Sequence, residues 1–289
     1  MRFILTVLLF LASGTAFAQA ARPPLWKLSD ADTTIYLFGT IHLLKPGTAW
    51  MTDDIQAALE GSRMLYLEVS LAEQQDVQKI QALVRKYGML PEGRTLSDSL
   101  PPEEAEALIS GLTALGLKRE AVERFKPWFA GMTLANMKFV RLGYNSSAGV
   151  EAALGGSAVA RDIPVKGLET LEFQLGMFDA MSEAETVAYI QDLLEEQEGL
   201  SATMTNVTTS WARGDLDTLD EEINDMVALS PALAERILYA RNRHWAGEIA
   251  GMLAEPGQVF VAVGSGHFVG ERSVIDYLEE RGLTVTRVQ

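Results

Sequence analysis

The sequence predicts an α/β fold: a mixed sheet built from two strand–G-x-x-H–helix–strand units, with a large helical insertion between them. Three observations predict it. The first unit carries Gly39-Thr40-Ile41-His42 directly after an apolar strand. An equivalent unit near the end of the chain carries Gly264-Ser265-Gly266-His267. Between them, from about residue 71 to residue 255, most segments have apolar residues at the spacing of helices.

The first eighteen residues have the pattern of a signal peptide. Arg2 precedes an apolar run from Phe3 to Leu11, and Ala16-Phe17-Ala18 supplies the small residues of a cleavage site. We expect cleavage before Gln19, export to the periplasm, and one domain over residues 19–289. No later stretch is long and apolar enough for a membrane helix, so we expect no membrane span after cleavage.

The composition excludes several kinds of site. The chain has 24 basic and 39 acidic residues, a net charge of -15, which makes nucleic acids and anionic membrane surfaces poor partners. It has no cysteine, so thiolate nucleophiles and cysteine-ligated zinc are excluded, and the hydrophobic core must stabilise the fold without disulfides.

In the first unit, β-prone runs at 25–28 and 33–38 predict a hairpin that leads into the first G-x-x-H motif. A helix is expected from Asp53 to Gly61, with Asp53 as its cap. Residues 64–69, MLYLEV, predict a buried strand whose only charge is Glu68.

The insertion is predicted to be helical, with one short strand at 165–168. Pro102 and Pro127 stand where helices favour proline, at the first turn. The expected helices cover residues 73–87, 102–115, 127–142, 183–198 and 231–253.

The last unit repeats the first. Residues 259–263, VFVAV, predict a buried strand before the second motif, then a helix over 271–281 ended by Gly282, and a final strand over 283–288. Right-handed crossovers would give parallel strand pairs in one sheet, with both motifs in the crevice at the carboxyl ends of the strands. The motif glycines would allow a sharp turn and a close approach to the backbone.

His42 and His267 are therefore expected to face one pocket, and they are two of only three histidines. Two imidazoles and a carboxylate suit a divalent metal ion, whereas the same histidines without a metal suit acid–base chemistry. Glu68 is the first candidate for the carboxylate, because a charge within a buried strand is costly unless it is paired or coordinated. Its alternative is a solvated carboxylate at the end of the strand.

Four further residues are weaker candidates for the site. Glu151 and Glu169 stand near predicted helix starts, where a carboxylate also has a purely structural use. Arg241 and Asn242 could orient a substrate carboxylate or carbonyl, although neighbouring helical positions point about 100° apart and a surface salt bridge would also explain Arg241. His244 has no matching context and is interpreted as a solvated or packing residue.

The sequence resembles the TraB/GumN family, which also includes PrgY and the animal Tiki proteins. The resemblance extends over essentially all of residues 19–289 and depends most on the two G-x-x-H motifs and the intervening glutamate. Its segments are LFGTIHLL at 37–44, LYLEV at 65–69, GVE at 149–151, GLET at 167–170, ARN at 240–242 and VGSGHFVGERSVIDYLEERGLTV at 263–285.

The resemblance implies a fold related to the erythromycin-esterase and ChaN-like group. For the Tiki branch it implies a metal-dependent protease that trims the amino-terminal part of a secreted signalling protein. The paired motif histidines of the family fall on His42 and His267, its strand glutamate on Glu68, and its Arg-Asn pair on Arg241 and Asn242.

Three functions are consistent with these observations. The first is a metal-dependent hydrolase, most simply a peptidase acting on a peptide or protein. In it His42, His267 and Glu68 would hold Mn, Co or Zn, Glu151 would shuttle a proton, and Arg241 and Asn242 would steady the substrate or oxyanion. The second is a non-catalytic periplasmic protein that binds a metal, haem or another small ligand. The third is a structural accessory in envelope polysaccharide production.

Overall fold

The computed structural model describes residues 21–195, 199–229 and 231–289. The predicted signal peptide, residues 1–18, lies outside this range. Within it, no helix is long and apolar enough to cross a membrane.

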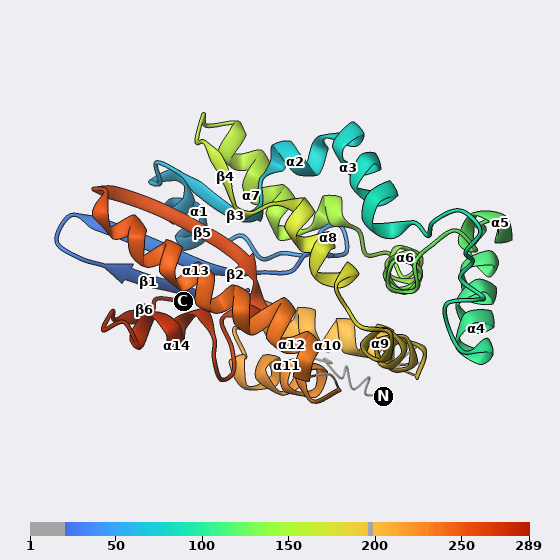
Figure 1. Cartoon of the computed structure of the whole chain (residues 1–289). Coiled ribbons are helices and arrows are strands. Elements are labelled where there is room, and N and C mark those ends of the chain that lie inside the picture. The colour runs from blue at the N-terminus through green and yellow to red at the C-terminus, as the bar shows by residue number, and fades with distance from the viewer. Residues whose placement is uncertain (1–20, 196–198, 230) are drawn as a thin grey trace, which may run out of the picture.

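The fold is mixed α/β, centred on a six-stranded sheet with the order β4-β3-β5-β2-β1-β6 (Figure 1). The four strands from β4 to β2 are parallel, whereas β1 is antiparallel to both β2 and β6. The strands are β1 (Leu25–Ser29), β2 (Thr33–Thr40), β3 (Leu65–Val69), β4 (Val165–Glu169), β5 (Gly257–Gly264) and β6 (Val285–Arg287).

The strand order differs in one respect from the expected pairs. The two strands of each unit do not pair with each other. In the first unit β5 lies between β2 and β3, and in the last unit β2 and β1 lie between β5 and β6. The two units are therefore interleaved in the sheet. This arrangement places the ends of β2 and β5, which carry the two G-x-x-H motifs, next to each other.

Helices cover both faces of the sheet, so the side chains of β5 are buried on both sides. Phe260 and Ala262 pack on one face with α1 (Asp53–Glu60), α7 (Val150–Val159) and α10 (Leu200–Arg213). Val259, Val261 and Val263 pack on the other face with α13 (Ala240–Gly251) and α14 (Val274–Glu279). Burying each valine or phenylalanine side chain contributes about 1.5–3 kcal/mol relative to exposure, which explains an unbroken apolar run in a central strand.

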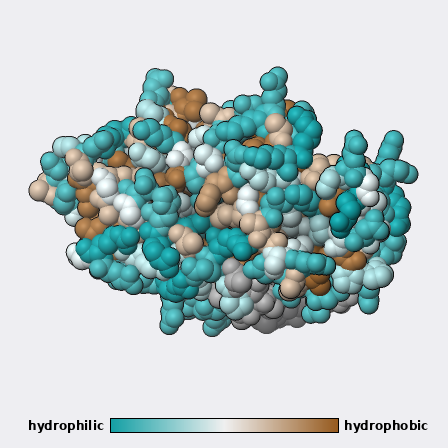
Figure 2. All heavy atoms as spheres, viewed as in Figure 1, coloured by the Kyte–Doolittle hydropathy of each residue, from teal (hydrophilic) through white to brown (hydrophobic). Residues whose placement is uncertain are grey.

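Four helices form a separate lobe with its own apolar core, at the end of the molecule away from the sheet (Figure 1). They are α4 (Pro102–Ala114), α5 (Arg119–Val122), α6 (Pro127–Arg141) and α9 (Glu183–Glu195). The face seen in Figure 2 is mainly hydrophilic, with apolar side chains in small separate groups. The remaining α-helices of the described chain are α2 (Leu71–Gln75), α3 (Val77–Leu83), α8 (Leu171–Asp179), α11 (Leu216–Leu229) and α12 (Pro231–Ala234).

Several predicted boundaries were wrong for local reasons. The cap of α1 is Thr52, whose hydroxyl accepts from the Ile55 N–H, and not Asp53. The expected helix over 73–87 is divided at Asp76, which caps α3 with its own side chain. The expected helix over 231–253 contains a π-helical turn at Glu235–Tyr239. The final helix and strand are shorter than expected, at Val274–Glu279 and Val285–Arg287.

Candidate functional site

The two G-x-x-H loops meet because β2 and β5 are parallel neighbours in register. Gly39 pairs with Val263 and Thr40 pairs with Gly264, so both strands end at the same edge of the sheet. A Cβ atom on Gly39 would lie 3.0 Å from the Cα of Ser265, closer than side chains normally approach a main-chain atom. Neither Gly39 nor Gly264 has a positive φ. Glycine is therefore required at position 39 by the close approach of the two loops, and not by a sharp turn.

Glu68 lies between the two histidines. It stands near the end of β3, beside β5, and is 7% exposed, so the solvated alternative was wrong. Its Oε1 is 3.8 Å from the Nε2 of His42 and 3.8 Å from the Nε2 of His267. The main-chain N–H of Gly264 donates to the same oxygen at 2.8 Å.

Gly264 leaves open the space between these three side chains. A Cβ atom there would lie 3.2 Å from Glu68 Oε1, 3.4 Å from His42 Nε2 and 3.6 Å from His267 Cδ2. Any larger residue at position 264 would therefore fill the centre of the constellation.

The second nitrogen of each imidazole has a partner of its own. His42 Nδ1 is 2.7 Å from Glu151 Oε1, and the hydroxyl of Thr40 donates to the same carboxylate oxygen. His267 Nδ1 is 2.5 Å from Asn242 Oδ1. Both rings thus turn Nε2 toward Glu68 and Nδ1 toward an orienting side chain.

The start of α7 brings Glu151 to His42. The Val150 N–H donates to the Ile41 carbonyl at 3.1 Å. A Cβ atom on Gly149 would lie 2.2 Å from the His42 carbonyl oxygen, so only glycine permits this contact. The motif GVE is therefore explained by its packing on the first G-x-x-H loop. Glu151, the second residue of α7, is buried beneath His42.

Arg241 is a buried residue of the site, so the surface salt bridge was the wrong interpretation. Its Nη2 is 2.6 Å from Glu68 Oε2 and also pairs with Glu169. Its Nη1 is 3.2 Å from His267 Nε2, and its guanidinium stacks 4.4 Å from the Trp245 ring centroid. Although Arg241 and Asn242 are neighbours on a helix, both contact His267, one at each ring nitrogen.

Sequence reasoning missed Gln174 of α8. Its amide nitrogen donates to Glu68 Oε2 at 3.0 Å and to Glu169 Oε1 at 2.7 Å. The residue stands five positions after Glu169 in an ordinary helical segment, and no spacing or motif distinguished it. His244, by contrast, is exposed on α13, as expected for a residue outside the site.

The ionisation of the site follows from burial and neighbouring charge. Burial would raise the pKa of Glu68, but His42, His267 and Arg241 outweigh it and lower the pKa to about 2. Burial lowers the pKa of His267 to about 3, so this ring is neutral near pH 7. Glu151 raises the pKa of His42, whose side chain is 60% exposed and so keeps access to solvent.

The donor set fits a divalent metal in its chemistry. Two imidazole nitrogens and one carboxylate oxygen are ligands that Mn, Co and Zn accept. Two atoms each about 2.1 Å from one ion can be at most about 4.2 Å apart, and the two Nε2–Oε1 separations of 3.8 Å lie within that limit. In the part of the chain that the structure describes, no three His, Cys, Asp or Glu side chains are gathered tightly enough to enclose an ion as they stand.

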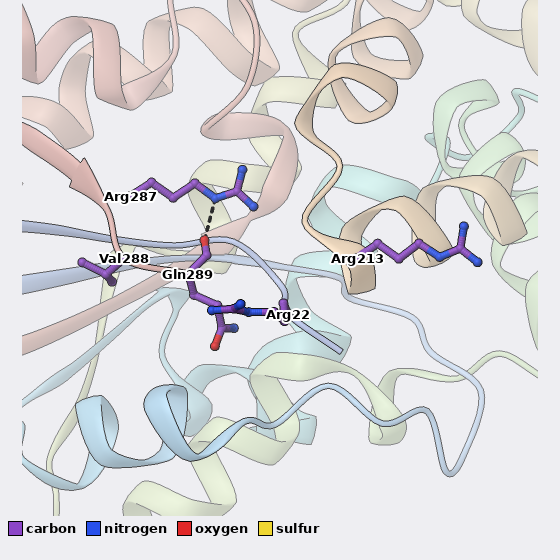
Figure 3. Close-up of a pocket in the computed structure, with 5 residues that line it drawn as sticks. All are labelled: Arg22, Arg213, Arg287, Val288 and Gln289. Carbon is purple, nitrogen blue, oxygen red and sulfur yellow. Dashed lines mark hydrogen bonds between the residues drawn. The ribbon is translucent and has the colours of Figure 1, made fainter. Parts of the chain in front are cut away.

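A separate depression of about 390 Å³ lies near the end of the chain (Figure 3). Arg287 donates there to the main-chain oxygen of Gln289, and Arg213 extends away from both in this view. None of its lining residues belongs to the histidine site; they are Arg22, Arg213, Arg287, Val288 and Gln289.

Comparison with known proteins identifies the family. The profile of the TraB/PrgY/gumN family matches residues 24–287, nearly the whole described chain. This chain belongs to the TraB/PrgY/gumN family. The predicted resemblance is therefore confirmed.

Two curated relatives carry the name metalloprotease. The chain is 24% identical to "Metalloprotease TIKI homolog" of Amphimedon queenslandica, over 91% of this chain and 61% of the relative. It is 25% identical to "Metalloprotease TIKI1" of Danio rerio, over 90% of this chain and 62% of the relative. The chain thus spans about three fifths of the length of these relatives. No solved structure matches the chain.

Proposed function

We propose that this protein is a metal-dependent hydrolase that cleaves peptides. The observation that carries the proposal is the orientation of the two imidazoles: each turns Nε2 toward Glu68 Oε1 and keeps Nδ1 on a partner of its own. Metal-ligating histidines have this arrangement, with one nitrogen for the ion and the other held by an outer carboxylate or carbonyl. The relatives named metalloprotease support the same class of reaction.

In this proposal His42, His267 and Glu68 hold the ion, which is Mn, Co or Zn. When bound, such an ion polarises a substrate carbonyl and lowers the pKa of water to near neutrality. The chain's own residues supply the rest. Gly264 and Gln174 each donate to Glu68 and fix its carboxylate between the histidines.

The geometry changes the roles first expected of two residues. Glu151 contacts His42 and Thr40 through one oxygen, so we assign it to orienting His42 and not to shuttling a proton. Asn242 is assigned to orienting His267 and not to steadying the substrate. Arg241 keeps the expected role, because its Nη1, close to His267 Nε2, provides positive charge where an oxyanion would develop.

One observation favours a second candidate, a protein that binds a metal or small ligand without hydrolysis. Arg241 already neutralises Glu68 and lies 3.2 Å from His267 Nε2, so a cation stands beside two of the three donors. If this guanidinium stays in place when the ion binds, it restricts the open coordination position that catalysis needs.

We also propose a periplasmic location and a fold related to the erythromycin-esterase and ChaN-like group. The location depends on the predicted signal peptide over residues 1–18. Separation of the cells into periplasmic and cytoplasmic fractions, with the mature N-terminus sequenced, tests the location. Cleavage before Gln19 is the expected result.

Metal analysis and a cleavage assay test the main proposal. The purified protein is incubated with Mn, Co or Zn, desalted and analysed for metal, and then given a peptide library with and without chelator. We expect bound metal and chelator-sensitive cleavage in the wild type, and loss of both in His42→Ala/His267→Ala. His244→Ala is the matched control and should behave as wild type. Wild-type protein with no more metal than the double variant would refute the metal site, and bound metal without cleavage would favour the binding protein.

A further inference from the structure

The protonation of each imidazole decides whether it can bind a metal. A neutral imidazole carries one proton, and only the nitrogen without that proton has a lone pair for an ion. For His42 and His267 to act together, both must carry the proton on Nδ1. The contacts around the two rings differ in how they could impose this.

The main-chain carbonyl of Arg272 fixes the orientation of the Asn242 amide beside His267. The Asn242 Nδ2 donates to the main-chain carbonyl of Arg272 at 2.9 Å. A carbonyl oxygen only accepts hydrogen bonds, so the amide NH2 must point toward Arg272 and Oδ1 must point toward His267. Oδ1 also only accepts, so the His267 nitrogen 2.5 Å away must be the one that carries the proton.

The Arg272 carbonyl reaches Asn242 through an unusual main-chain conformation. Arg272 has a φ of 62°, in the left-handed region that non-glycine residues rarely adopt, and Gly270, two residues before it, has a φ of 72°. Such strain persists only where surrounding contacts enforce it, and it is concentrated at functional sites. The Arg272 side chain supplies those contacts, since it stacks 3.9 Å from the Tyr239 ring centroid and pairs with Glu235.

His42 reaches the same orientation with a different partner. Its Nδ1 faces the carboxylate of Glu151, which as an anion can only accept. One ring is thus held by a charged group and the other by a neutral amide that is itself held by a carbonyl. The neutral partner suits His267, because this ring is buried beside Glu68 and Arg241, where a further charge would be costly.

We propose that Arg272 and Asn242 form a relay that holds His267 with its proton on Nδ1 and its lone pair on Nε2. In this relay the Arg272 carbonyl orients the Asn242 amide, and the amide selects the tautomer. Both are positioning residues, which act through His267. The purpose of the relay rests on the proposed metal site, but the tautomer is a property of the metal-free protein and can be measured there.

Nitrogen NMR of the protein labelled in its histidines tests the relay directly. The chain has three histidines, and exposed His244 provides an internal reference on the same helix as Asn242. In the metal-free wild type we expect His267 to be protonated on Nδ1. Asn242→Leu should weaken this preference, because only the Arg241 guanidinium, 3.2 Å from Nε2, would still favour it. Asn242→Asp should keep it, because a carboxylate oxygen still accepts from Nδ1.

Arg272→Gly separates the carbonyl from the side chain. Glycine adopts a positive φ without strain and keeps the carbonyl, so His267 should remain protonated on Nδ1. A shift of the proton to Nε2 in this variant would overturn the claim that the carbonyl holds the amide without help from the Arg272 side chain. Wild-type His267 protonated on Nε2 would overturn the relay altogether, and this result does not depend on the folding of any variant.

Metal affinity provides the second readout. By titration with Mn, Co or Zn we expect Asn242→Leu to bind about 10–100-fold more weakly than wild type, the usual effect of losing an outer partner of a ligating histidine. Wild type with the Nδ1 proton but no metal binding would refute the proposed function and leave the relay intact. Unchanged affinity in Asn242→Leu, with the tautomer altered, would refute the relay's role in metal binding.

Discussion

The indole N–H of Trp211 donates a hydrogen bond of 2.8 Å to the main-chain carbonyl of Gly39. Trp211 belongs to α10 and is fully buried, and Gly39 is the first residue of the first G-x-x-H motif. The bond joins the insertion to the end of β2. It gives the main-chain carbonyl of Gly39, a buried residue, a side-chain hydrogen-bond partner.

We expect Trp211→Phe to lower the free energy of unfolding by about 1–3 kcal/mol, because the Gly39 carbonyl would lose its side-chain partner in a buried place. Urea unfolding followed by circular dichroism measures this. Trp245→Phe is the matched control, since Trp245 is also fully buried but its indole N–H has no partner among the described residues. Equal losses in the two variants would show that packing, and not the hydrogen bond, is responsible.

A methyl group at position 264 should block the candidate metal site. Its Cβ would lie 3.2 Å from Glu68 Oε1 and 3.4 Å from His42 Nε2, in the space an ion would need. We expect Gly264→Ala to bind metal roughly 10–100-fold more weakly in a calorimetric titration. Gly156→Ala, where a Cβ would meet nothing within 4 Å, should bind as wild type. Wild-type affinity in Gly264→Ala would place the ion elsewhere.

The sequence predicted the parts of the fold that depend on local pattern. The buried runs at 64–69 and 259–263 and the paired G-x-x-H motifs indicated parallel strands that end at one edge, and β2 and β5 do so. The strand order was not predictable, because nothing in the pattern of β3 distinguishes pairing with β5 from pairing with β2. The geometry of Arg241 and Asn242 was hidden for a similar reason: a π-helical turn at Glu235–Tyr239 directly precedes them, and apolar spacing does not reveal such turns.

The sequence also could not predict the role of a residue that reaches the site through a single contact. Gln174 and Arg272 reach the site through one amide and one main-chain carbonyl. Gln174 stands in no motif, and Arg272 lies in the segment 263–285, where no pattern indicates a contact made by its carbonyl. Glu68 was identifiable because a charge in an apolar strand requires a partner, whereas a polar residue in an amphipathic helix does not.

The stability of the metal-free protein should be greatest near pH 6.5 and fall on either side. The folded-state pKa of His267 is lowered to about 3 from 6.5, so the unfolded chain binds more protons between these values and stability is lost as the pH falls through this window. Glu68, with its pKa lowered to about 2 from 4.5, adds a loss of the same sign at lower pH. The pKa of His42 is raised, so its contribution is complete below 6.5 and is lost as the pH rises through the folded-state pKa.

Thermal unfolding in the presence of chelator, from pH 3 to pH 10, measures this profile. His267→Gln should remove the loss between about pH 6.5 and 4.5 and leave the loss at lower pH, because a glutamine does not titrate. His244→Gln is the control and should keep the wild-type profile. A wild-type melting temperature that does not change between pH 7 and pH 5 would contradict the neutral, buried state of His267.

Replacing Arg241 should lower the stability of the folded protein much more than replacing its exposed neighbour Arg243. Its guanidinium pairs with both Glu68 and Glu169 and stacks on Trp245, all in a buried place. We expect Arg241→Met to cost about 3–5 kcal/mol in unfolding free energy, because two carboxylates would lose a buried partner. Arg243→Met, at a position 52% exposed two residues away, should cost less than about 1 kcal/mol.

Added divalent metal should restore part of the stability of Arg241→Met, since an ion at Glu68 would replace the missing charge. No recovery with Mn, Co or Zn would mean that Glu68 accepts only the guanidinium, and the hydrolase proposal would lose its third ligand.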